Sequence, residues 1–400
     1  MRTPRLAFVA CHLPYPPISG GRRRELELIR RVAHEFDVHL LVASKSFEAD
    51  RRNARHMERY CTTVEVFAAE PPRAREQGRA ALPEQVLRHS CRALGRRVEE
   101  LLATDPPDVL HVEGYYLMQH VPGDPGVPVV LAEQNVEYEL DRQRAAVARR
   151  ADGDLQVARA ARSEQEAWRR ADAVVVVTPE DRAPVRAAHP RLDVRVVPDG
   201  SDHLPLRAPG DVPAQRPEAP LVAFLGNFAY APNVDGAVHL CRDVLPLLRT
   251  RVPDAHVWLV GNAPPAEVRA LAGPRVTVTG RVPEVAPYID AADAVACPLR
   301  IGGGIKVKVI EAIQRGKALV TTTVGAHGLP PRARAAVAVA DGPEAIAAAL
   351  EPLLLDAELR AATERRVLAA AASLPTWDAA AAALTAIYHE LADERAAALA

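Results

Sequence analysis

The chain has 400 residues, of which 48% are hydrophobic and 25% are charged. This composition is that of a globular protein with two or three domains. The formal net charge of -1 argues against nucleic acid as the main partner, because nucleic-acid-binding surfaces are basic. The five cysteines form no C-x-x-C pair, so we expect reduced thiols rather than a disulfide or zinc framework.

Apolar runs in the sequence are short. The first, LAFVACHL at 6–13, is too short for the core of a signal peptide, and none reaches the roughly 18 residues that a bilayer requires. We therefore expect a cytoplasmic protein. The arginines of GGRRRELELIRR (20–31) are spaced one heptad apart, which suggests either a solvated helix face or peripheral contact with the anionic inner face of a membrane.

Strand-like and helix-like segments alternate along the first half of the chain. Segments with helical periodicity include 20–35, 84–103 and 138–170. Between such segments lie short runs rich in β-branched residues, which we predict to be strands at 6–12, 37–44, 63–69, 108–114, 128–135, 172–178 and 193–200. Nearly continuous apolar strands separated by helices are typical of a parallel sheet buried on both faces.

A proline-rich, aperiodic stretch at 201–220 interrupts this alternation, which then begins again. Six further strands are predicted at 221–227, 255–262, 276–282, 293–299, 318–324 and 335–341. The sequence therefore predicts an α/β protein with two Rossmann-like parallel-sheet domains facing a cleft. Their bounds are 1–202 for the first domain, 203–219 for a linker and 220–375 for the second domain, followed by a terminal helix at 376–400.

The stretch GGGIKVKVIEAIQRGK (302–317) contains three of the four lysines in the chain and follows a predicted strand. Glycines allow backbone N–H groups to approach a ligand, and a helix that begins near Ile305 adds further donors. Lysines near a helix N-terminus are unfavourable unless an anion binds there. Lys308 and Glu311 share a helix face whereas Lys306 points away, so we expect Lys308 to bind a phosphate and Glu311 a neighbouring hydroxyl group. A solvated ion pair is the alternative.

Residues 277–329 resemble the donor-binding region of the GT-B glycosyltransferases of family 4, in the branch with a GGG-[IT]-K-x-K-x-x-E-A signature. The resemblance covers essentially the whole chain, and the other stretches that agree are 14–25, 108–114, 132–144, 197–202 and 224–240. It implies GT-B architecture and retaining transfer of a sugar from a nucleotide-diphosphate sugar to an acceptor hydroxyl. The donor would bind the C-terminal domain, the acceptor mostly the N-terminal domain, and helix 376–400 would pack back on the N-terminal domain.

The resemblance also implies roles for individual residues. Lys308 matches the lysine that binds the diphosphate, and Glu311 matches the glutamate that holds the ribose hydroxyls. The donor-binding set is Gly302, Gly303, Gly304, Ile305, Lys306, Lys308, Glu311, Gly226, Asn227, Arg281 and Val282. Gly20 and Gly21 match a loop on the acceptor side that approaches the reaction centre.

Three residues of the first domain allow two interpretations each. His111, at the end of a predicted strand, either orients an acceptor or the β-phosphate, and is then catalytic together with Lys308 and Glu311, or is a hydrogen-bonded structural histidine. Glu133 and Asn135, at the carboxyl edge of the next strand, either line the acceptor side or are structural.

The sequence departs from the family at three places. Gly303 occupies the position of a common glutamate, Asn227 and Asn233 stand where a basic pair is common, and Gln134 replaces a histidine. A sugar-nucleotide epimerase or hydrolase on the same fold, or a non-catalytic nucleotide-sugar-binding protein, therefore remains an alternative. The histidines lack metal-ligand spacing, so we expect neither a metal nor a cofactor beyond the donor substrate.

Overall fold

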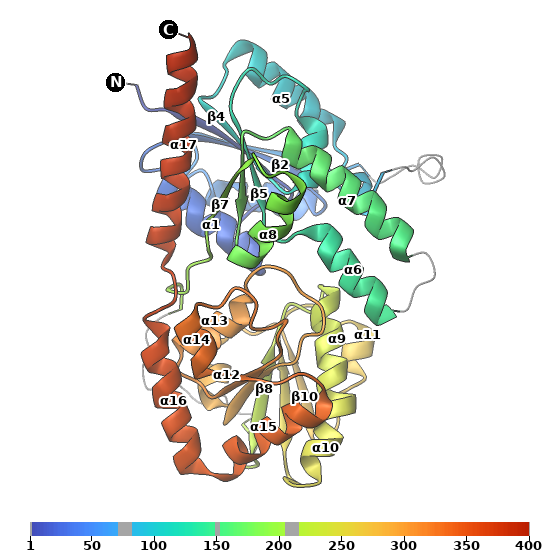
Figure 1. Cartoon of the computed structure of the whole chain (residues 1–400). Helices are drawn as coiled ribbons and strands as arrows, with labels where there is room; N and C mark the ends of the chain where they lie inside the picture. The colour runs from blue at the N-terminus through green and yellow to red at the C-terminus, as the bar shows by residue number, and fades with distance from the viewer. Residues whose placement is uncertain (1, 71–81, 149–152, 205–215, 400) are drawn as a thin grey trace. The chain divides into compact units, whose positions relative to one another are not determined.

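The computed structural model describes residues 2–70, 82–148, 153–204 and 216–399 (Figure 1). The chain divides into two compact units: the first comprises Met1–Asp199 and Trp377–Ala400, and the second Gly200–Thr376. Each unit is built around one sheet of parallel strands. Residues 205–215 of the predicted linker lie outside the described residues.

The sheet of the first unit has seven strands in the order β3-β2-β1-β4-β5-β6-β7, and every pairing is parallel. The chain moves outward from β1 in one direction and then in the other, as in doubly wound α/β folds. The strands are β1 (Arg5–Ala10), β2 (Asp37–Ser44), β3 (Thr63–Ala68), β4 (Val109–Glu113), β5 (Val129–Glu133), β6 (Ala173–Val176) and β7 (Asp193–Val196).

Helices cover both faces of this sheet because alternate strand residues point to opposite sides. One face packs on α1 and α17, which lie side by side in Figure 1, and the other packs on α5 and α7. The helical segments are α1 (Gly20–Val32), α2 (Phe47–Asn53), η1 (Ala54–His56), α4 (Glu84–Arg88), α5 (Arg92–Thr104), η2 (Tyr115–His120), α6 (Glu137–Ala148), α7 (Gly153–Arg169), α8 (Pro179–Ala188) and α17 (Trp377–Leu399). Trp168 of α7 and Trp377 of α17 are fully buried, one in each core.

Two of the heptad-spaced arginines of α1 form ion pairs with residues outside this helix. Arg24 is buried, and its guanidinium lies 2.6 Å from a carboxylate oxygen of Asp199, which is also buried. Arg31 contacts Glu27 on its own helix at 2.6 Å and Asp378 at the start of α17 at 2.5 Å. These two side chains therefore join α1 to neighbouring segments of its own unit.

The second unit repeats the same winding, with six parallel strands in the order β10-β9-β8-β11-β12-β13. They are β8 (Leu221–Leu225), β9 (His256–Val260), β10 (Val276–Gly280), β11 (Ala294–Cys297), β12 (Leu319–Thr321) and β13 (Ala338–Val339). The helical segments are α9 (Ala231–His239), η3 (Leu240–Val244), α10 (Leu245–Arg249), α11 (Ala266–Arg269), α12 (Ala286–Ala291), α13 (Val307–Gln314), α14 (Pro331–Ala336), α15 (Pro343–Leu355) and α16 (Ala357–Ala371). The predicted α/β class with two parallel sheets is confirmed.

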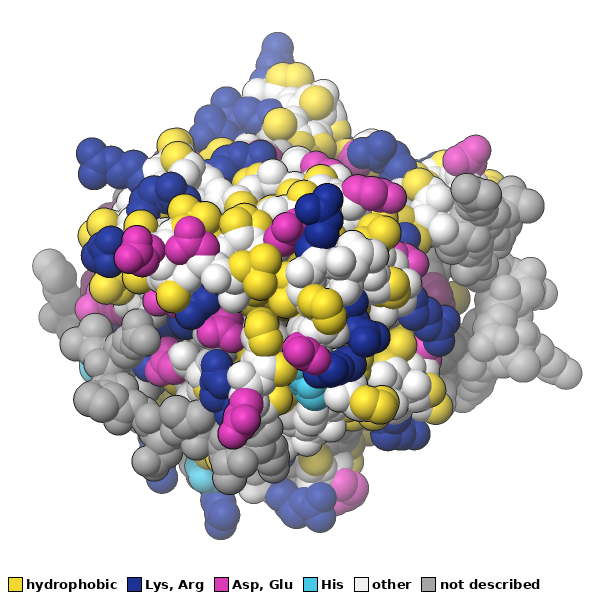
Figure 2. Space-filling model, turned by 90° about the horizontal axis from the view of Figure 1, so that it is seen from below, with side chains coloured by type: hydrophobic (Ala, Val, Ile, Leu, Met, Phe, Trp, Pro, Cys, Tyr) yellow, Lys and Arg dark blue, Asp and Glu magenta, His cyan; other side chains and the backbone are white. Residues whose placement is uncertain are grey.

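Charges of both signs are interspersed on the face of the molecule seen in Figure 2, with apolar side chains between them. This mixture agrees with the formal net charge of -1. Among the described helices, none combines the length and the apolar character that crossing a membrane would require.

Candidate functional site

The carboxyl edge of the second sheet gathers the predicted donor-binding residues. Gly226 and Asn227 directly follow β8, Arg281 and Val282 follow β10, and the loop 298–306 connects β11 to α13. The strand order reverses between β8 and β11, which are neighbours in the sheet. Ligands of doubly wound sheets bind outside the carboxyl ends of the strands at such a reversal.

A glycine contact holds the ends of β8 and β9 close together. Gly261 has a φ of +151°, and a Cβ at this position would lie 1.7 Å from the carbonyl oxygen of Gly226. The amide of Gly226 donates to the carbonyl of Val260 at 2.9 Å, and the amide of Phe228 donates to Asn262, also at 2.9 Å. The backbone after β8 is therefore fixed against the end of β9, and no side chain fits between them.

Helix α13 begins at Val307, two residues after the expected start, with Lys306 as the residue before its first turn. Gly304 has a φ of +56°, which favours glycine and turns the chain into the helix. The amides of Val309 and Ile310 both donate to the carbonyl of Lys306, at 2.8 and 3.2 Å. The first N–H groups of a helix have no intrahelical acceptor, so this end of α13 offers donors and a positive dipole end to an anion.

The ammonium of Lys306 closes the glycine loop. Its Nζ donates to the carbonyls of Gly303 and Gly304 at 2.8 and 2.7 Å, and the residue is buried. The loop packs tightly on this side chain, because a Cβ on Gly302 would lie 2.6 Å from Lys306 Cε. In this arrangement the charge of Lys306 stabilises the loop, and its contact with a donor stays a prediction.

Lys308, by contrast, extends toward α9 and the end of β8. Its Nζ donates to Asn233 Oδ1 and lies 4.8 Å from the centre of the Phe224 ring. Asn233 in turn donates from Nδ2 to the carbonyl of Asn227 at 2.8 Å. Burial lowers the pKa of Lys308, although Cys297 and Glu311 oppose this effect. A neighbouring anion would favour the charged form of this ammonium.

Glu311 is held by a histidine that the sequence analysis did not select. His203 Nε2 lies 2.9 Å from Glu311 Oε1, and the His203 side chain is almost completely buried. His203 lies 108 positions before Glu311 in a segment assigned to the linker, and no local pattern marks it as a partner. Lys308 and Glu311 thus lie on one helix but are bonded to different elements of the second unit.

The predicted acceptor-side glycines lie at the start of α1 in the first unit. Gly20 and Gly21 follow Ser19, whose hydroxyl accepts a hydrogen bond from the amide of Arg22. A Cβ on Gly21 would lie 2.6 Å from Gln134 Oε1, so the glycine loop contacts the carboxyl edge of the sheet beyond β5. Asn135, the next residue, has its Nδ2 3.4 Å from Glu137 Oε1.

His111 and Glu133 both lie in the core of the first unit. His111 is 1% exposed, and its ring nitrogens lie 3.0 Å from Glu113 Oε1 and 2.8 Å from the hydroxyl of Tyr388. Glu133 accepts a hydrogen bond from Trp168 Nε1 at 3.1 Å, and burial raises its pKa well above the ordinary value. These contacts fit the structural interpretation of both residues, and their contact with an acceptor stays a prediction.

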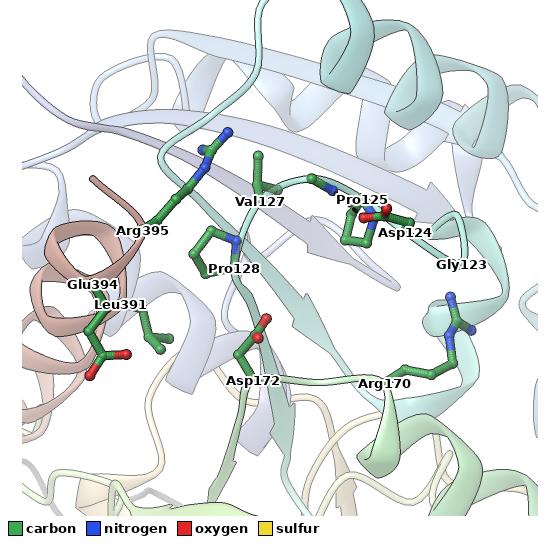
Figure 3. A pocket seen from close by; sticks show the side chains of 11 residues that line it. Gly123, Asp124, Pro125, Val127, Pro128, Arg170, Asp172, Leu391, Glu394 and Arg395 are labelled. Atoms are coloured by element: carbon green, nitrogen blue, oxygen red, sulfur yellow. Dashed lines mark hydrogen bonds between the residues drawn. The ribbon is translucent and has the colours of Figure 1, made fainter. Parts of the chain in front are cut away.

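A hollow of about 460 Å³ lies at the opposite edge of the first sheet (Figure 3). It is lined by residues that precede β5 and β6 and by the last turns of α17. Arg170 donates to the carbonyls of Met118, Val121 and Pro122, and Asp172 accepts from the amide of Val129. These groups are engaged in joining loops, so we assign the hollow no role. Within the described part of the chain, no cluster of three or more His, Cys, Asp or Glu residues could hold a metal ion.

Comparison with known proteins supports the assignment of the second unit. Residues 219–356 match the family described as glycosyl transferases group 1. No curated protein sequence matches the chain at a significant level.

Several solved structures share the fold over nearly the whole chain. Sucrose-phosphate synthase from Thermosynechococcus elongatus has 17% identity and a TM-score of 0.69, with 97% of this chain and 99% of that chain covered. Anabaena HepE in complex with UDP-glucose has 15% identity and a TM-score of 0.65, with 98% and 99% covered. A glycosyltransferase from Rickettsia africae has 10% identity and a TM-score of 0.61, with 98% and 99% covered.

The fold and the family match define the class of protein. The chain has the GT-B architecture of the solved structures to which it is similar, and residues 219–356 of its second unit match the group 1 glycosyl transferase family. The expected fold and the expected transferase class are therefore confirmed. The loop 302–304, Lys308 and Glu311 all lie within the matched residues 219–356.

Proposed function

We propose that the protein transfers a sugar, with retention of anomeric configuration, from a nucleoside diphosphate sugar to an acceptor hydroxyl. The diphosphate docks against the N-terminus of α13 and the ammonium of Lys308, and Glu311 binds the ribose hydroxyls. The acceptor binds mainly the first unit, near the loop of Gly20 and Gly21.

One observation carries this proposal: the half-buried ammonium of Lys308 lies beside the positive end of a helix. Lys308 is the second residue of α13, where a cation is unfavourable, and burial adds to this cost by lowering its pKa. Its described contacts are a neutral amide oxygen and an aromatic ring, not a carboxylate. A bound diphosphate would compensate for this cost, and stabilising the departing diphosphate is the main electrostatic requirement of the reaction.

The solved neighbours suggest which donor to test first. HepE of Anabaena was crystallised with UDP and with UDP-glucose. Asn233 places an amide group, rather than a positive charge, next to Lys308. We infer that the donor pocket relies on Lys308 and the α13 amides for neutralisation, and that the reaction needs no metal ion.

The proposal is tested in two stages. First, thermal unfolding is measured with UDP-, GDP-, ADP- and dTDP-sugars, because a ligand that binds only the folded state raises the melting temperature. Second, the stabilising donor is incubated with candidate acceptors, with and without EDTA, and the products are analysed by NMR. A glycoside that retains the donor's anomeric configuration, plus nucleoside diphosphate, is the expected result in both samples.

The alternatives give different products. An epimerase interconverts free sugar nucleotides without an acceptor, a hydrolase releases free sugar, and a binding protein is stabilised without any turnover. Failure of every nucleotide sugar to stabilise the protein would contradict the assignment of the donor site.

A further inference from the structure

At the carboxyl edge of the first sheet, a thiol contacts an imidazole, and this imidazole contacts a carboxylate. Cys11 and His12 directly follow β1, and Glu25 projects from α1. Cys11 Sγ lies 3.2 Å from His12 Nδ1, and His12 Nε2 lies 3.0 Å from Glu25 Oε1. This order of nucleophile, base and orienting group is the arrangement that activates cysteine nucleophiles in proteins.

We propose that Cys11, His12 and Glu25 form a reactive-thiol site that is modified by small soft electrophiles such as low-molecular-weight disulfides and thiosulfonates. The Cys11 thiolate attacks one sulfur of the reagent and forms a new S–S bond. The original S–S bond breaks, and its electron pair leaves with the second sulfur as a thiolate or a sulfinate. The thiol proton stays on His12, so no external oxidant is needed.

The charges around the site favour the thiolate. Burial by itself would raise the pKa of Cys11, yet the charge and hydrogen bond of His12 hold it well below the ordinary value. Burial opposes protonation of His12 as well, but Cys11 and Glu25 hold the pKa of its imidazole well above the ordinary value. Burial raises the pKa of Glu25 to about 7, against the influence of His12.

Other polar groups that face the three residues do not replace these contacts. The Tyr116 hydroxyl lies 3.5 Å from Cys11 Sγ, and His89 stacks on the Tyr116 ring at 4.0 Å and also lowers the pKa of Cys11. Lys45 Nζ lies 2.8 Å from His89 Nε2.

On the carboxylate side, Gln134 Nε2 lies 3.4 Å from Glu25 Oε1, and Glu113 contributes a like charge. Glu25 is completely buried, and its second oxygen, Oε2, has no hydrogen-bond partner. Glu25 Oε1 is therefore the oxygen that contacts both the imidazole of His12 and the amide of Gln134.

The thiol is less exposed than its neighbour His12. Cys11 is 6% exposed, whereas the side chain of His12 is 22% exposed. We therefore expect a small reagent to approach the sulfur beside the imidazole. The site needs neither donor nor acceptor, so the proposal stands apart from the glycosyl transfer proposed above.

The chain supplies its own control thiols. Burial raises the pKa of Cys61 and of Cys241 to about 12, and it also raises the pKa values of Cys91 and Cys297. Cys241 is the most exposed of the five cysteines. If exposure alone decided reactivity, Cys241 would react before Cys11.

The test is the pH dependence of modification by methyl methanethiolsulfonate, followed at each cysteine by mass spectrometry of quenched samples between pH 6 and 8. An ordinary thiol with a pKa near 8.5 should react roughly 75-fold faster at pH 8 than at pH 6, because its thiolate fraction rises by that factor. We expect the rate at Cys11 to change less than about threefold. Comparing the rate at Cys11 between two pH values removes the effect of its limited exposure, because that exposure is the same in both measurements.

Substitutions of His12 and Glu25 separate the triad from chance proximity, and Cys11→Ser is the control for the label. His12→Gln should lower the Cys11 rate at pH 6 at least tenfold and restore the ordinary pH dependence. Glu25→Gln should lower the rate at pH 8, where the Glu25 carboxyl is ionised. Cys11→Ser should remove the label from this peptide. Failure of Cys11 to react at any pH in this range, or a pH dependence in the native protein like that of an ordinary thiol, would overturn the proposal even if neither variant folds.

Discussion

Replacing Lys308 by methionine tests the donor site most directly. Methionine has a similar length and keeps apolar contact with the Phe224 ring, but it removes the ammonium that bonds Asn233 Oδ1. A charge-assisted hydrogen bond to a phosphate is worth about 1.5–3 kcal/mol, which corresponds to a fall of roughly 13- to 160-fold in kcat/KM. The assay is the rate of glycoside formation with the donor that stabilises the native protein.

The folded structure should survive this change. Asn233 keeps its Nδ2 bond to the carbonyl of Asn227, so the substitution leaves one amide oxygen without its partner, at a cost of about 1–3 kcal/mol in the free energy of unfolding. Lys317→Met is the matched control, since Lys317 lies beyond the far end of α13 and pairs with Glu364 at 2.6 Å. A folded Lys308→Met protein with kcat/KM within twofold of the native value would refute the donor site.

Three further substitutions test the packing and the electrostatics of the two units. Gly261→Ala should lower the free energy of unfolding of the second unit by at least about 2 kcal/mol, because its Cβ would lie 1.7 Å from a backbone carbonyl oxygen at a φ of +151°. Asp199→Asn should cost about 3–5 kcal/mol by leaving the buried guanidinium of Arg24 without its counter-ion. Glu25→Gln should make the free energy of unfolding less dependent on pH. The pKa of Glu25 is raised from 4.5 to about 7 in the folded protein, so ionisation between these values favours the unfolded state. The native protein should therefore lose on the order of 3 kcal/mol relative to the variant as the pH rises through this window.

Urea unfolding measures all three effects, and each has a matched comparison. Gly273→Ala places its Cβ in open space and should change stability by less than about 0.5 kcal/mol. Arg2→Ala removes an exposed ion pair with Asp108 and should cost less than about 1 kcal/mol. Equal losses in each matched pair would contradict the packing argument. For Glu25→Gln, the contrary result is an unfolding midpoint that changes between pH 5 and pH 8 as much as that of the native protein.

The central strands were predictable because they are almost completely buried and their sequences are nearly continuous apolar runs, as in β5 and β6. For example, DVHLLVAS predicted β2 with its observed bounds. Helix interruptions were harder to predict. The periodic segment 84–103 is divided between α4 and α5, because Cys91 adopts an extended backbone with a φ of -154°.

The site was predictable only in outline, because side-chain partners come from distant segments. Helical geometry predicted that Lys306 and Lys308 point in different directions. Lys306, however, precedes the helix, so its position depends on the left-handed turn at Gly304 and not on helical spacing. His203 reaches Glu311 across 108 positions, and Tyr388 reaches His111 across 277. Sequence spacing cannot predict these contacts, because the partners come together only when the sheets fold.

The place of α17 in the first unit has a consequence for biosynthesis. Trp377, Tyr388 and four further apolar residues of α17 complete an apolar core whose members outside α17 all precede residue 200. A growing polypeptide therefore emerges from the ribosome with that side of its first sheet uncovered. The unit formed by Gly200–Thr376 is complete in sequence before this last segment has been translated. The half that is synthesised first therefore finishes folding last, and until then it offers an apolar surface that chaperones could bind.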